Sequence, residues 1–384
     1  MSHASQQDLV AETSFDCIVI GAGIAGASVA AELAAHKRVL LLEQESQPGY
    51  HATGRSAAIY TIAYGPPVIR ALTRASGAFF ENPPNARITA PLLLPRGVFI
   101  IARADQTEDL AQLQEELGAA VAYVSADEII RTVPLLRPDY AAGGLFDSSA
   151  SDIDVHALHQ FYLRKFKATG GRIVTGERAL EVSRGAEWQV STARARYTAP
   201  IVVNAAGAWA DDVAARAGIA PKGLVPKMRT ALIVTPPQGV IPDNWPMVVD
   251  VAEQFYLKAD AGNLLISPAD AVPSPACDAQ PDEYQVALCI DRIERAFELR
   301  IKRIQSKWAG LRSFLPDGCP LAAYEPSAPG FFWLAGQGGY GIQTAPALAR
   351  AAAALIECKP LPDDILAQGV TEAALGADRK GLAA

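Results

Sequence analysis

Short apolar runs alternate with a helical segment at the start of the chain. Residues 15–20 (FDCIVI) are apolar and β-branched, as expected for a strand of a parallel sheet that is buried on both faces. A glycine-rich turn and SVAAELAAH, which has helical composition, separate this run from a second apolar run, RVLLLE. This order of strand, helix and strand predicts the βαβ unit that opens a Rossmann-type domain.

Beyond this unit, polarity patterns and capping residues indicate both helices and strands, which is typical of an α/β protein. The predicted elements are a helix from Pro67 to Phe80, a capping box at Ser125, an N-cap at Asp154, short strands over 172–203, a helix over 284–304, and strands over 307–314 and 331–335.

Composition excludes several classes of protein. Half of the 384 residues are hydrophobic and 20% are charged, which excludes a largely disordered chain. The net charge of −7 argues against a nucleic-acid partner. Five scattered cysteines without a C-x-x-C pair argue against a disulfide framework or a zinc site. His156 and His159 lie three residues apart but have no third ligand, so we expect a solvated helix face and no metal.

The most apolar stretch, residues 18–35, fits a strand, a turn and a helix better than a membrane span, because glycines and Glu32 interrupt it. The polar N-terminus lacks the apolar core of a signal peptide. We therefore expect a cytoplasmic protein without an integral membrane segment, either free or peripheral to the inner face of the membrane.

The turn Gly21-Ala-Gly23-Ile-Ala-Gly26 matches the pattern G-x-G-x-x-G. The first glycine allows the tight turn, the second lets the backbone approach a pyrophosphate, and the third lets the helix pack on the strand. Glu43 ends the second strand, 20 residues after Gly23, where a carboxylate accepts ribose hydroxyls. This combination predicts a dinucleotide site.

Two later segments favour FAD over NAD. Residues 201–209 (IVVNAAGAW) form a further apolar run that ends in small residues, and residues 336–344 (GQGGYGIQT) open a helix near the C-terminus. Glycine-rich turns at both ends of the chain can hold both ends of one long cofactor, whereas an NAD enzyme needs only the first.

The motifs together resemble the D-amino-acid oxidase-like family of flavoproteins, and within it the bacterial D-arginine dehydrogenases. The resemblance covers roughly residues 15–365 and rests on IVIGAGIAGAS, EQESQPGYHATGRSAAIYTIAYG, VVNAAGAW, FYLKADAG, WAGLRSF and GQGGYGIQT. It implies oxidation of a D-amino acid to an imino acid by hydride transfer to flavin N5, followed by hydrolysis to a 2-oxo acid and ammonia. Quinone, dye or O2 would accept the electrons.

The resemblance also implies the fold and the cofactor site. We expect a discontinuous Rossmann-type FAD-binding domain (15–60, 145–210 and 310–365), an α+β substrate domain with a mixed, mostly antiparallel sheet (61–144 and 211–309), and tails at 1–14 and 366–384. The residues expected around noncovalent FAD are Gly21, Gly23, Ile24, Ala25, Gly26, Glu43, Gln44, Thr53, Gly54, Arg55, Ser56, Ala57, Ala179, Leu180, Ala205, Ala206, Gly207, Trp209, Gly338, Tyr340, Gly341, Ile342, Gln343 and Thr344.

Four residues match those that hold the substrate carboxylate in these enzymes: Arg229, Arg312, Tyr64 and Tyr256. A guanidinium fork fixes a carboxylate in two directions, and a tyrosine hydroxyl adds a further anchor. By the same resemblance Gln343 belongs to the catalytic set, and Gly339 and Tyr340 line the pocket. The hydride route requires no general base, so we assign no histidine a catalytic role.

The chain departs from its arginine-oxidising relatives at the side-chain pocket. Val98 stands where they place an acidic residue, and Ile59 stands where they place a histidine. Burying a guanidinium against these residues would cost several kcal/mol. We therefore expect neutral or hydrophobic D-amino acids as substrates, unless another acid such as Glu81 compensates.

Two other functions remain open at this stage. The same carboxylate anchors suit a secondary or cyclic amino acid or a 2-hydroxy acid. A flavin-binding protein without turnover would carry the same cofactor motifs.

Overall fold

The computed structural model describes residues 12–84 and 90–382. Its first sheet has six strands in the order β10-β3-β2-β14-β21-β20, all paired in parallel except β20 with β21. Every residue of β2 and β3 is buried, which confirms the two apolar runs as strands of a doubly covered sheet. The strands are β2 (Cys17–Ile20), β3 (Val39–Leu42), β10 (Arg172–Val174), β14 (Ile201–Asn204), β20 (Leu321–Tyr324) and β21 (Phe331–Ala335).

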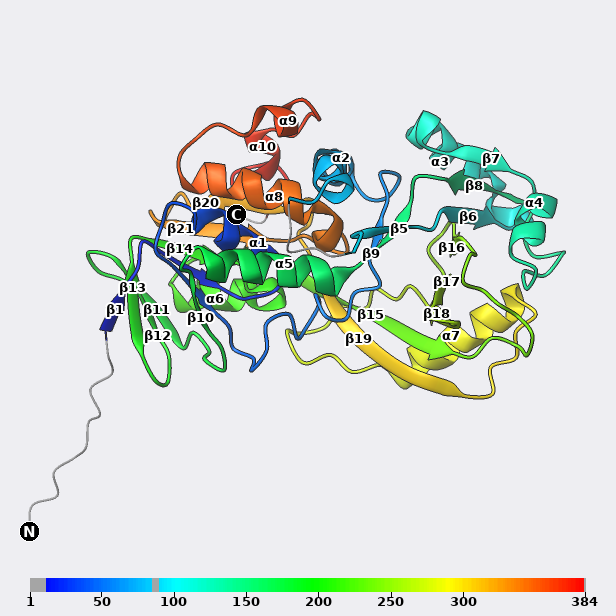
Figure 1. Cartoon of the computed structure of the whole chain (residues 1–384), viewed down its shortest axis with the longest axis horizontal. Helices are drawn as coiled ribbons and strands as arrows, with labels where there is room; N and C mark the ends of the chain where they lie inside the picture. Colours follow the sequence, from blue (N-terminus) through cyan, green and yellow to red (C-terminus); the bar gives the residue numbers. More distant parts are fainter. Residues whose placement is uncertain (1–11, 85–89, 383–384) are drawn as a thin grey trace, which may run out of the picture.

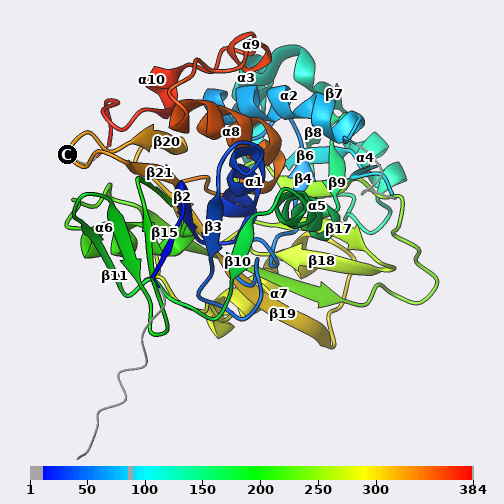
Figure 2. The ribbon, with the colours of Figure 1, turned by 60° about the vertical axis from the view of Figure 1, so that its left-hand side comes forward.

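Helices cover one face of this sheet, and a four-stranded sheet with α6 covers the other (Figure 1, Figure 2). The first face packs against α1 (Ile24–Leu33), α5 (Val155–Ala168) and α8 (Gly341–Ile356), with α2 (Pro67–Glu81) beside α8. The second face packs against α6 (Ala210–Arg216) and against β1 (Glu12–Ser14), β13 (Arg196–Ala199), β12 (Trp188–Ser191) and β11 (Glu181–Arg184).

The largest sheet has eight strands in the order β19-β15-β18-β17-β16-β6-β8-β7, antiparallel except for β16 with β6. The long strands β15 and β19 run from beneath the first sheet toward α7 (Figure 1). This mixed sheet beside a Rossmann-type sheet confirms the predicted fold class. The strands are β6 (Val98–Ala102), β7 (Ala122–Val124), β8 (Gly143–Asp147), β15 (Val225–Val234), β16 (Met247–Asp250), β17 (Tyr256–Asp260), β18 (Asn263–Ser267) and β19 (Ile304–Phe314).

The two faces of this large sheet have different neighbours. One face packs against α7 (Glu283–Ala296) and α4 (Ala126–Thr132) through residues such as Leu232 and Leu257. Because side chains alternate along a strand, Ala231 and Tyr256 lie on the opposite face, where they form a separate cluster with Ala57. Near this face lies a three-stranded sheet, β4 (Ile59–Tyr60), β9 (Ser151–Ile153) and β5 (Leu93–Pro95). The remaining helix of this region is α3 (Thr107–Leu117).

Ser125 and Asp154 cap α4 and α5 as predicted, and three other expectations need correction. The helix expected over 284–304 ends at Ala296, because Phe297 is extended and buried and bridges to Leu136. Residues 12–14 of the expected N-terminal tail pair with β13, whereas residues 1–11 lie outside the described residues. The expected C-terminal tail (366–384) packs on the protein through α10 (Glu372–Leu375), where Leu375 is fully buried, and α9 (Asp363–Leu366) comes just before it.

Candidate active site

The glycine-rich turn between β2 and α1 leaves no room for side chains at its first and third glycines. Gly21 has φ 101°, and a Cβ there would lie 2.5 Å from the carbonyl oxygen of Ala205. A Cβ on Gly26 would lie 1.8 Å from the carbonyl oxygen of Gly21, because α1 packs directly on the turn. The amino end of α1 thereby reaches a cavity, where its partial positive charge favours a pyrophosphate.

Glu43 is buried at the end of β3 and holds this turn in place. Its Oε2 accepts the N–H of Ala22 at 2.8 Å, and its Oε1 accepts the N–H of Glu45 at 2.9 Å. Burial raises the pKa of Glu43, and these two N–H groups oppose the rise. Each carboxylate oxygen keeps a lone pair for a ribose hydroxyl. Glu43 therefore shapes the turn as well as lining the cavity.

His159 corrects the expectation of a solvated helix face. Its side chain is buried, and Nε2 lies 3.0 Å from the carbonyl oxygen of Ala22 in the glycine-rich turn. Burial lowers the pKa of His159, which favours the neutral imidazole. The residue supports the turn from behind.

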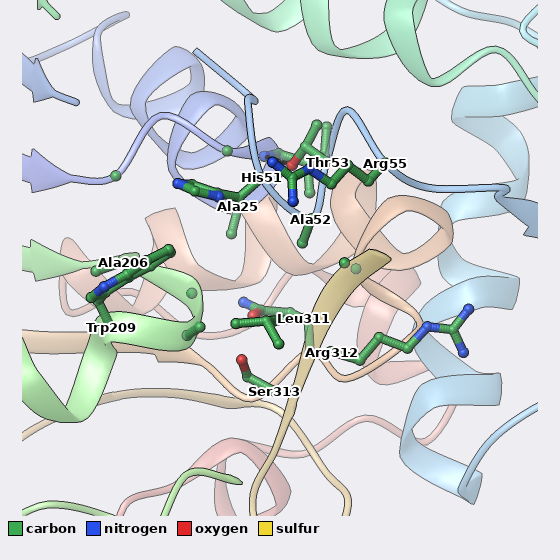
Figure 3. Close-up of a pocket in the computed structure, with 18 of the residues that line it drawn as sticks. Ala25, His51, Ala52, Thr53, Arg55, Ala206, Trp209, Leu311, Arg312 and Ser313 are labelled. Atoms are coloured by element: carbon green, nitrogen blue, oxygen red, sulfur yellow. Dashed lines mark hydrogen bonds between the residues drawn. The ribbon is translucent and has the colours of Figure 1, made fainter. Parts of the chain in front are cut away.

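One cavity extends from the glycine-rich turn to the eight-stranded sheet (Figure 3). Figure 3 shows Thr53 and Arg55 on one side, with Leu311 and Ser313 of β19 facing them. Of the residues expected at the cofactor, those that line the cavity are Gly21, Gly23, Ile24, Ala25, Glu43, Gln44, Thr53, Arg55, Ser56, Ala57, Ala179, Ala205, Ala206, Gly207, Trp209, Gly338, Gly341 and Ile342.

The other expected residues lie behind the cavity wall or point elsewhere. Leu180 is 53% exposed to solvent, and the Thr344 hydroxyl donates to the carbonyl oxygen of Tyr340 at 2.9 Å. Gly54 has no space for a Cβ, which would lie 2.7 Å from the carbonyl oxygen of Gly49. The set outside the wall is Gly26, Gly54, Leu180, Tyr340, Gln343 and Thr344.

Arg55 lines the cavity, but its guanidinium forms its hydrogen bonds and its ion pair with other residues of the protein. Nη1 donates to the carbonyl oxygens of Ala279 at 2.9 Å and Ala309 at 3.0 Å, and Nη2 pairs with Asp278. The guanidinium carbon lies 5.1 Å from the centre of the Tyr50 ring. Arg55 therefore ties its loop to the segment around Asp278, a contact between residues more than 200 positions apart that sequence reasoning missed.

The cavity fits FAD at both ends. Glu43 and Gln44 lie at one end, and the amino end of α8 lies at the other. Gln337 lines this second end, where its Nε2 is buried without a hydrogen-bond partner among the described residues. A buried donor of this kind is costly unless a ligand supplies an acceptor, as the carbonyl groups of a flavin do. The amino end of α8 also suits the negative charge of a reduced flavin.

The cavity is lined by three of the four residues that were expected to hold a carboxylate, Arg229, Tyr256 and Arg312, and Tyr64 lies outside its wall. β15 and β19 pair so that Arg229 opposes Gly310 and Lys227 opposes Arg312, which places Arg229 and Arg312 on the sheet face opposite α7. Figure 3 shows Arg312 pointing to the opposite side of β19 from Leu311 and Ser313.

Tyrosines surround this arginine pair. The rings of Tyr64 and Tyr340 are 5.0 Å apart at an angle of 65°. Gly339 lets the chain pass Arg312 closely, since a Cβ there would lie 2.9 Å from Nη1 of Arg312. The structure thus gathers the predicted clamp from four separate segments of the chain.

The electrostatics of this pair depend on burial and on the tyrosines. Burial and then the charge of Arg312 lower the pKa of Arg229. Burial also opposes the charged form of Arg312, but Tyr64 and Tyr256 favour it, and the pKa of Arg312 is raised overall. An anion between the two guanidinium groups would relieve their repulsion.

Gln343 lies one layer behind the cavity wall. Its Oε1 accepts the backbone N–H of Thr61 at 3.3 Å, and its Nε2 is buried without a partner among the described residues. The Thr61 hydroxyl in turn donates to the buried carboxylate of Asp147 at 2.5 Å. Asp147 and Thr61 therefore orient Gln343, a chain of contacts that no sequence motif signals.

The FAD-dependent oxidoreductase family model matches residues 16–355. The chain belongs to this family. Glycine oxidase from Pseudomonas aeruginosa is 26% identical over 375 residues, which cover 88% of this chain and 94% of that protein. FAD is therefore the cofactor, and the protein is an oxidoreductase with a small-molecule substrate and an electron acceptor.

Solved structures of FAD-dependent oxidoreductases share the fold. The crystal structure of glycine oxidase from Geobacillus kaustophilus has a TM-score of 0.77, 22% identity, and coverage of 90% of this chain and 95% of that chain. The crystal structure of L-proline dehydrogenase from P. horikoshii has a TM-score of 0.74 and 22% identity, and the match covers 94% of this chain and 100% of that chain. Among residues 12–84 and 90–382, no helix is long and apolar enough to cross a membrane.

Proposed function

We propose that this FAD-dependent oxidoreductase oxidises D-amino acids with neutral or hydrophobic side chains to 2-oxo acids and ammonia. The arginine pair at the end of the cofactor cavity carries the proposal. Within the described residues, the only carboxylate near either guanidinium is Glu253, at 3.9 Å from Nη2 of Arg229. Two buried cations that the protein neutralises so little are suited to bind the carboxylate of an amino acid.

When bound, FAD supplies the acceptor for the hydride that leaves the α-carbon. Arg229 and Arg312 hold the carboxylate and so fix the direction of the Cα–H bond, which is the main contribution that positioning makes to such a reaction. Burial raises the pKa of Tyr64, so its hydroxyl stays protonated and can donate to the same carboxylate. The amine reacts in its neutral form, because its lone pair forms the C=N bond.

A row of side chains across the eight-stranded sheet supports a substrate with a neutral side chain. Met247 pairs with Val98, and Val98 pairs with Asp147. Lys258 lies two residues along β17 from Tyr256, on the same face of the sheet. Val98 therefore lies on the same sheet face as Tyr256, in the neighbouring row of side chains.

The two charged members of this row are already paired. Lys258 Nζ donates to Asp152 at 2.7 Å, and Asp147 accepts from Thr61. Ile59 opposes Asp152 in the small sheet and precedes Thr61 by two residues. It is therefore directed at the apolar middle of the row, between these two contacts. An apolar substrate tip buried there gains about 25 cal/mol per Å2, which a charged tip would not.

A second candidate function keeps the same clamp and changes the substrate. Glycine oxidase and L-proline dehydrogenase are among the similar proteins. A secondary or cyclic amino acid, or a 2-hydroxy acid, would present the same carboxylate to Arg229 and Arg312. We further propose that FAD is bound noncovalently and that quinone, dye or O2 accepts the electrons. We also propose that the protein is cytoplasmic and that its FAD-binding domain is discontinuous, with the bounds 15–60, 145–210 and 310–365.

Anaerobic reduction of the enzyme-bound flavin tests these functions. The panel pairs D-Leu, D-Met, D-Phe and D-Arg with their L forms and adds proline, sarcosine and 2-hydroxy acids. Bleaching of the flavin by neutral D-amino acids supports the proposal, and bleaching only by proline-like or hydroxy acids supports the second candidate. No bleaching by any of them would indicate a flavin-binding protein without turnover. Repeating the active substrates with a dye and with O2 identifies the type of acceptor.

A further inference from the structure

Glu253 lies in the turn between β16 and β17, at the arginine pair. The turn is organised by Asp250, whose buried carboxylate accepts the N–H of Ala252 at 3.0 Å and of Gln254 at 3.3 Å. Nη1 of Arg103 also lies 3.3 Å from this carboxylate. The backbone N–H of Glu253 donates to the carbonyl oxygen of Asp250 at 2.8 Å. Glu253 is thus presented by a well-supported turn.

The backbone of Glu253 is strained. Its φ is 50°, in the left-handed region that glycine occupies freely and that glutamate rarely adopts. Such strain persists only where the surrounding structure imposes it, here through the hydrogen bonds of Asp250 to the turn, and it is concentrated at functional sites. This observation is independent of the charge of the residue.

The carboxylate of Glu253 acts on the whole substrate end of the cavity. Its Oε2 lies 3.9 Å from Nη2 of Arg229, and its side chain is 48% exposed whereas that of Arg229 is 11% exposed. Burial raises the pKa of Tyr64 and of Tyr340, and the charge of Glu253 adds to both effects. Its charge also favours the protonated forms of Arg229 and Arg312.

We infer that Glu253 is a specificity-determining residue that matches the charge of the arginine pair to a substrate with a single carboxylate. The inference rests on the proposed function, because it assumes that Arg229 and Arg312 hold a carboxylate. With Glu253 ionised, these three side chains carry a net charge of one, which one substrate carboxylate balances. A second carboxylate would then meet a neutralised site with Glu253 nearby, and like charges repel.

The test compares two ligands of similar size and different charge, butyrate and succinate, on the holoenzyme. Their dissociation constants are measured from the change in flavin absorbance for the wild type, Glu253→Gln and Glu253→Gly. Glycine suits the left-handed backbone, so the second variant removes the charge without backbone strain. Glu115→Gln is the matched control, because it makes the same change of net charge on the exposed surface of α3.

Loss of the Glu253 charge should tighten succinate by about tenfold and butyrate by about threefold or less, since a half-exposed charge is partly screened. Both Glu253 variants should behave alike, and the control should match the wild type. The gain for succinate should shrink between about 0.05 M and about 0.5 M NaCl, because the Debye length falls over this range.

Equal changes for the two ligands, or no change, would overturn the inference while the proposed function stands. A difference between the ligands that salt does not reduce would also overturn it, because the effect would then be structural. If the wild type binds neither acid, the assignment of Arg229 and Arg312 to a carboxylate fails, and this inference fails with it.

Discussion

Replacing Arg312 with alanine should nearly abolish turnover while FAD stays bound. Arg312 lies at the far end of the cavity from the glycine-rich turn, and Gly339 packs against its guanidinium. On the proposed assignment, the substitution removes one of the two cations that hold the substrate carboxylate and leaves the residues around the glycine-rich turn unchanged. Lysine should restore only part of the activity, because an ammonium lacks the planar fork that binds both carboxylate oxygens.

The size of the effect follows from the position of the charge. A pair of opposite unit charges 4 Å apart is worth about 4 kcal/mol at an effective dielectric constant of about 20. Truncating one partner of such a buried pair costs about 2–5 kcal/mol, so kcat/KM should fall about 30- to 5,000-fold. A loss of about 340-fold in kcat/KM, near the middle of this range, corresponds to about 3.5 kcal/mol.

The assay is steady-state kcat/KM with a dye acceptor, together with the flavin absorbance of the purified variant. Arg295→Ala is the matched control, since Arg295 is an exposed arginine of α7 with a side chain 74% accessible to solvent. Wild-type kcat/KM in Arg312→Ala would refute the carboxylate assignment. A colourless Arg312→Ala variant would show instead that the residue serves the cofactor.

Three further outcomes are expected. Glu43→Ala should weaken FAD binding by about 1–3 kcal/mol in a fluorescence titration of the apoprotein, and an unchanged dissociation constant, or uptake of NAD instead, would contradict the cofactor assignment. Val98→Glu should shift kcat/KM toward D-Arg and D-Lys, mainly through KM, whereas a wild type that already prefers D-Arg would show that another acid meets the guanidinium. Burial lowers the pKa of His159, so its stabilising effect is present above the unfolded value of about 6.5 and is lost as pH falls below it. The urea midpoint should therefore drop more between about pH 7 and about pH 5 in the wild type than in His159→Gln, and equal drops would exclude this role.

The Rossmann-type unit was predictable from the sequence because its determinants are local. The buried strands β2 and β3 are continuous apolar runs, and the glycines between them are imposed by contacts within the turn. The clamp residues were reached through family resemblance, since a single arginine in a strand carries no local signal of its role. The prediction of helix beyond Ala296 was wrong because a contact between distant residues decides the structure there. The pairing of Phe297 with Leu136 overrides helical propensity.

The contacts that hold the site residues in place from behind were not predictable from the sequence. Asp147 reaches Thr61, and Arg55 reaches Asp278, across long stretches of sequence, and each contact exists only once distant segments of the chain are packed together. The strained position of Glu253 likewise depends on a turn that Asp250 closes.

The strand–turn–helix at the glycine-rich turn follows from local sequence, because hydrophobic burial and glycine geometry act between near neighbours in the chain. Which charges face one another at the end of the cavity depends instead on how distant strands pair in the fold. Arg229 and Arg312 come from two strands whose pairing sets their separation, and Glu253 comes from a third region of the same sheet. Electrostatic energies depend on distance and burial in space, and neither is encoded in the spacing of residues along the chain.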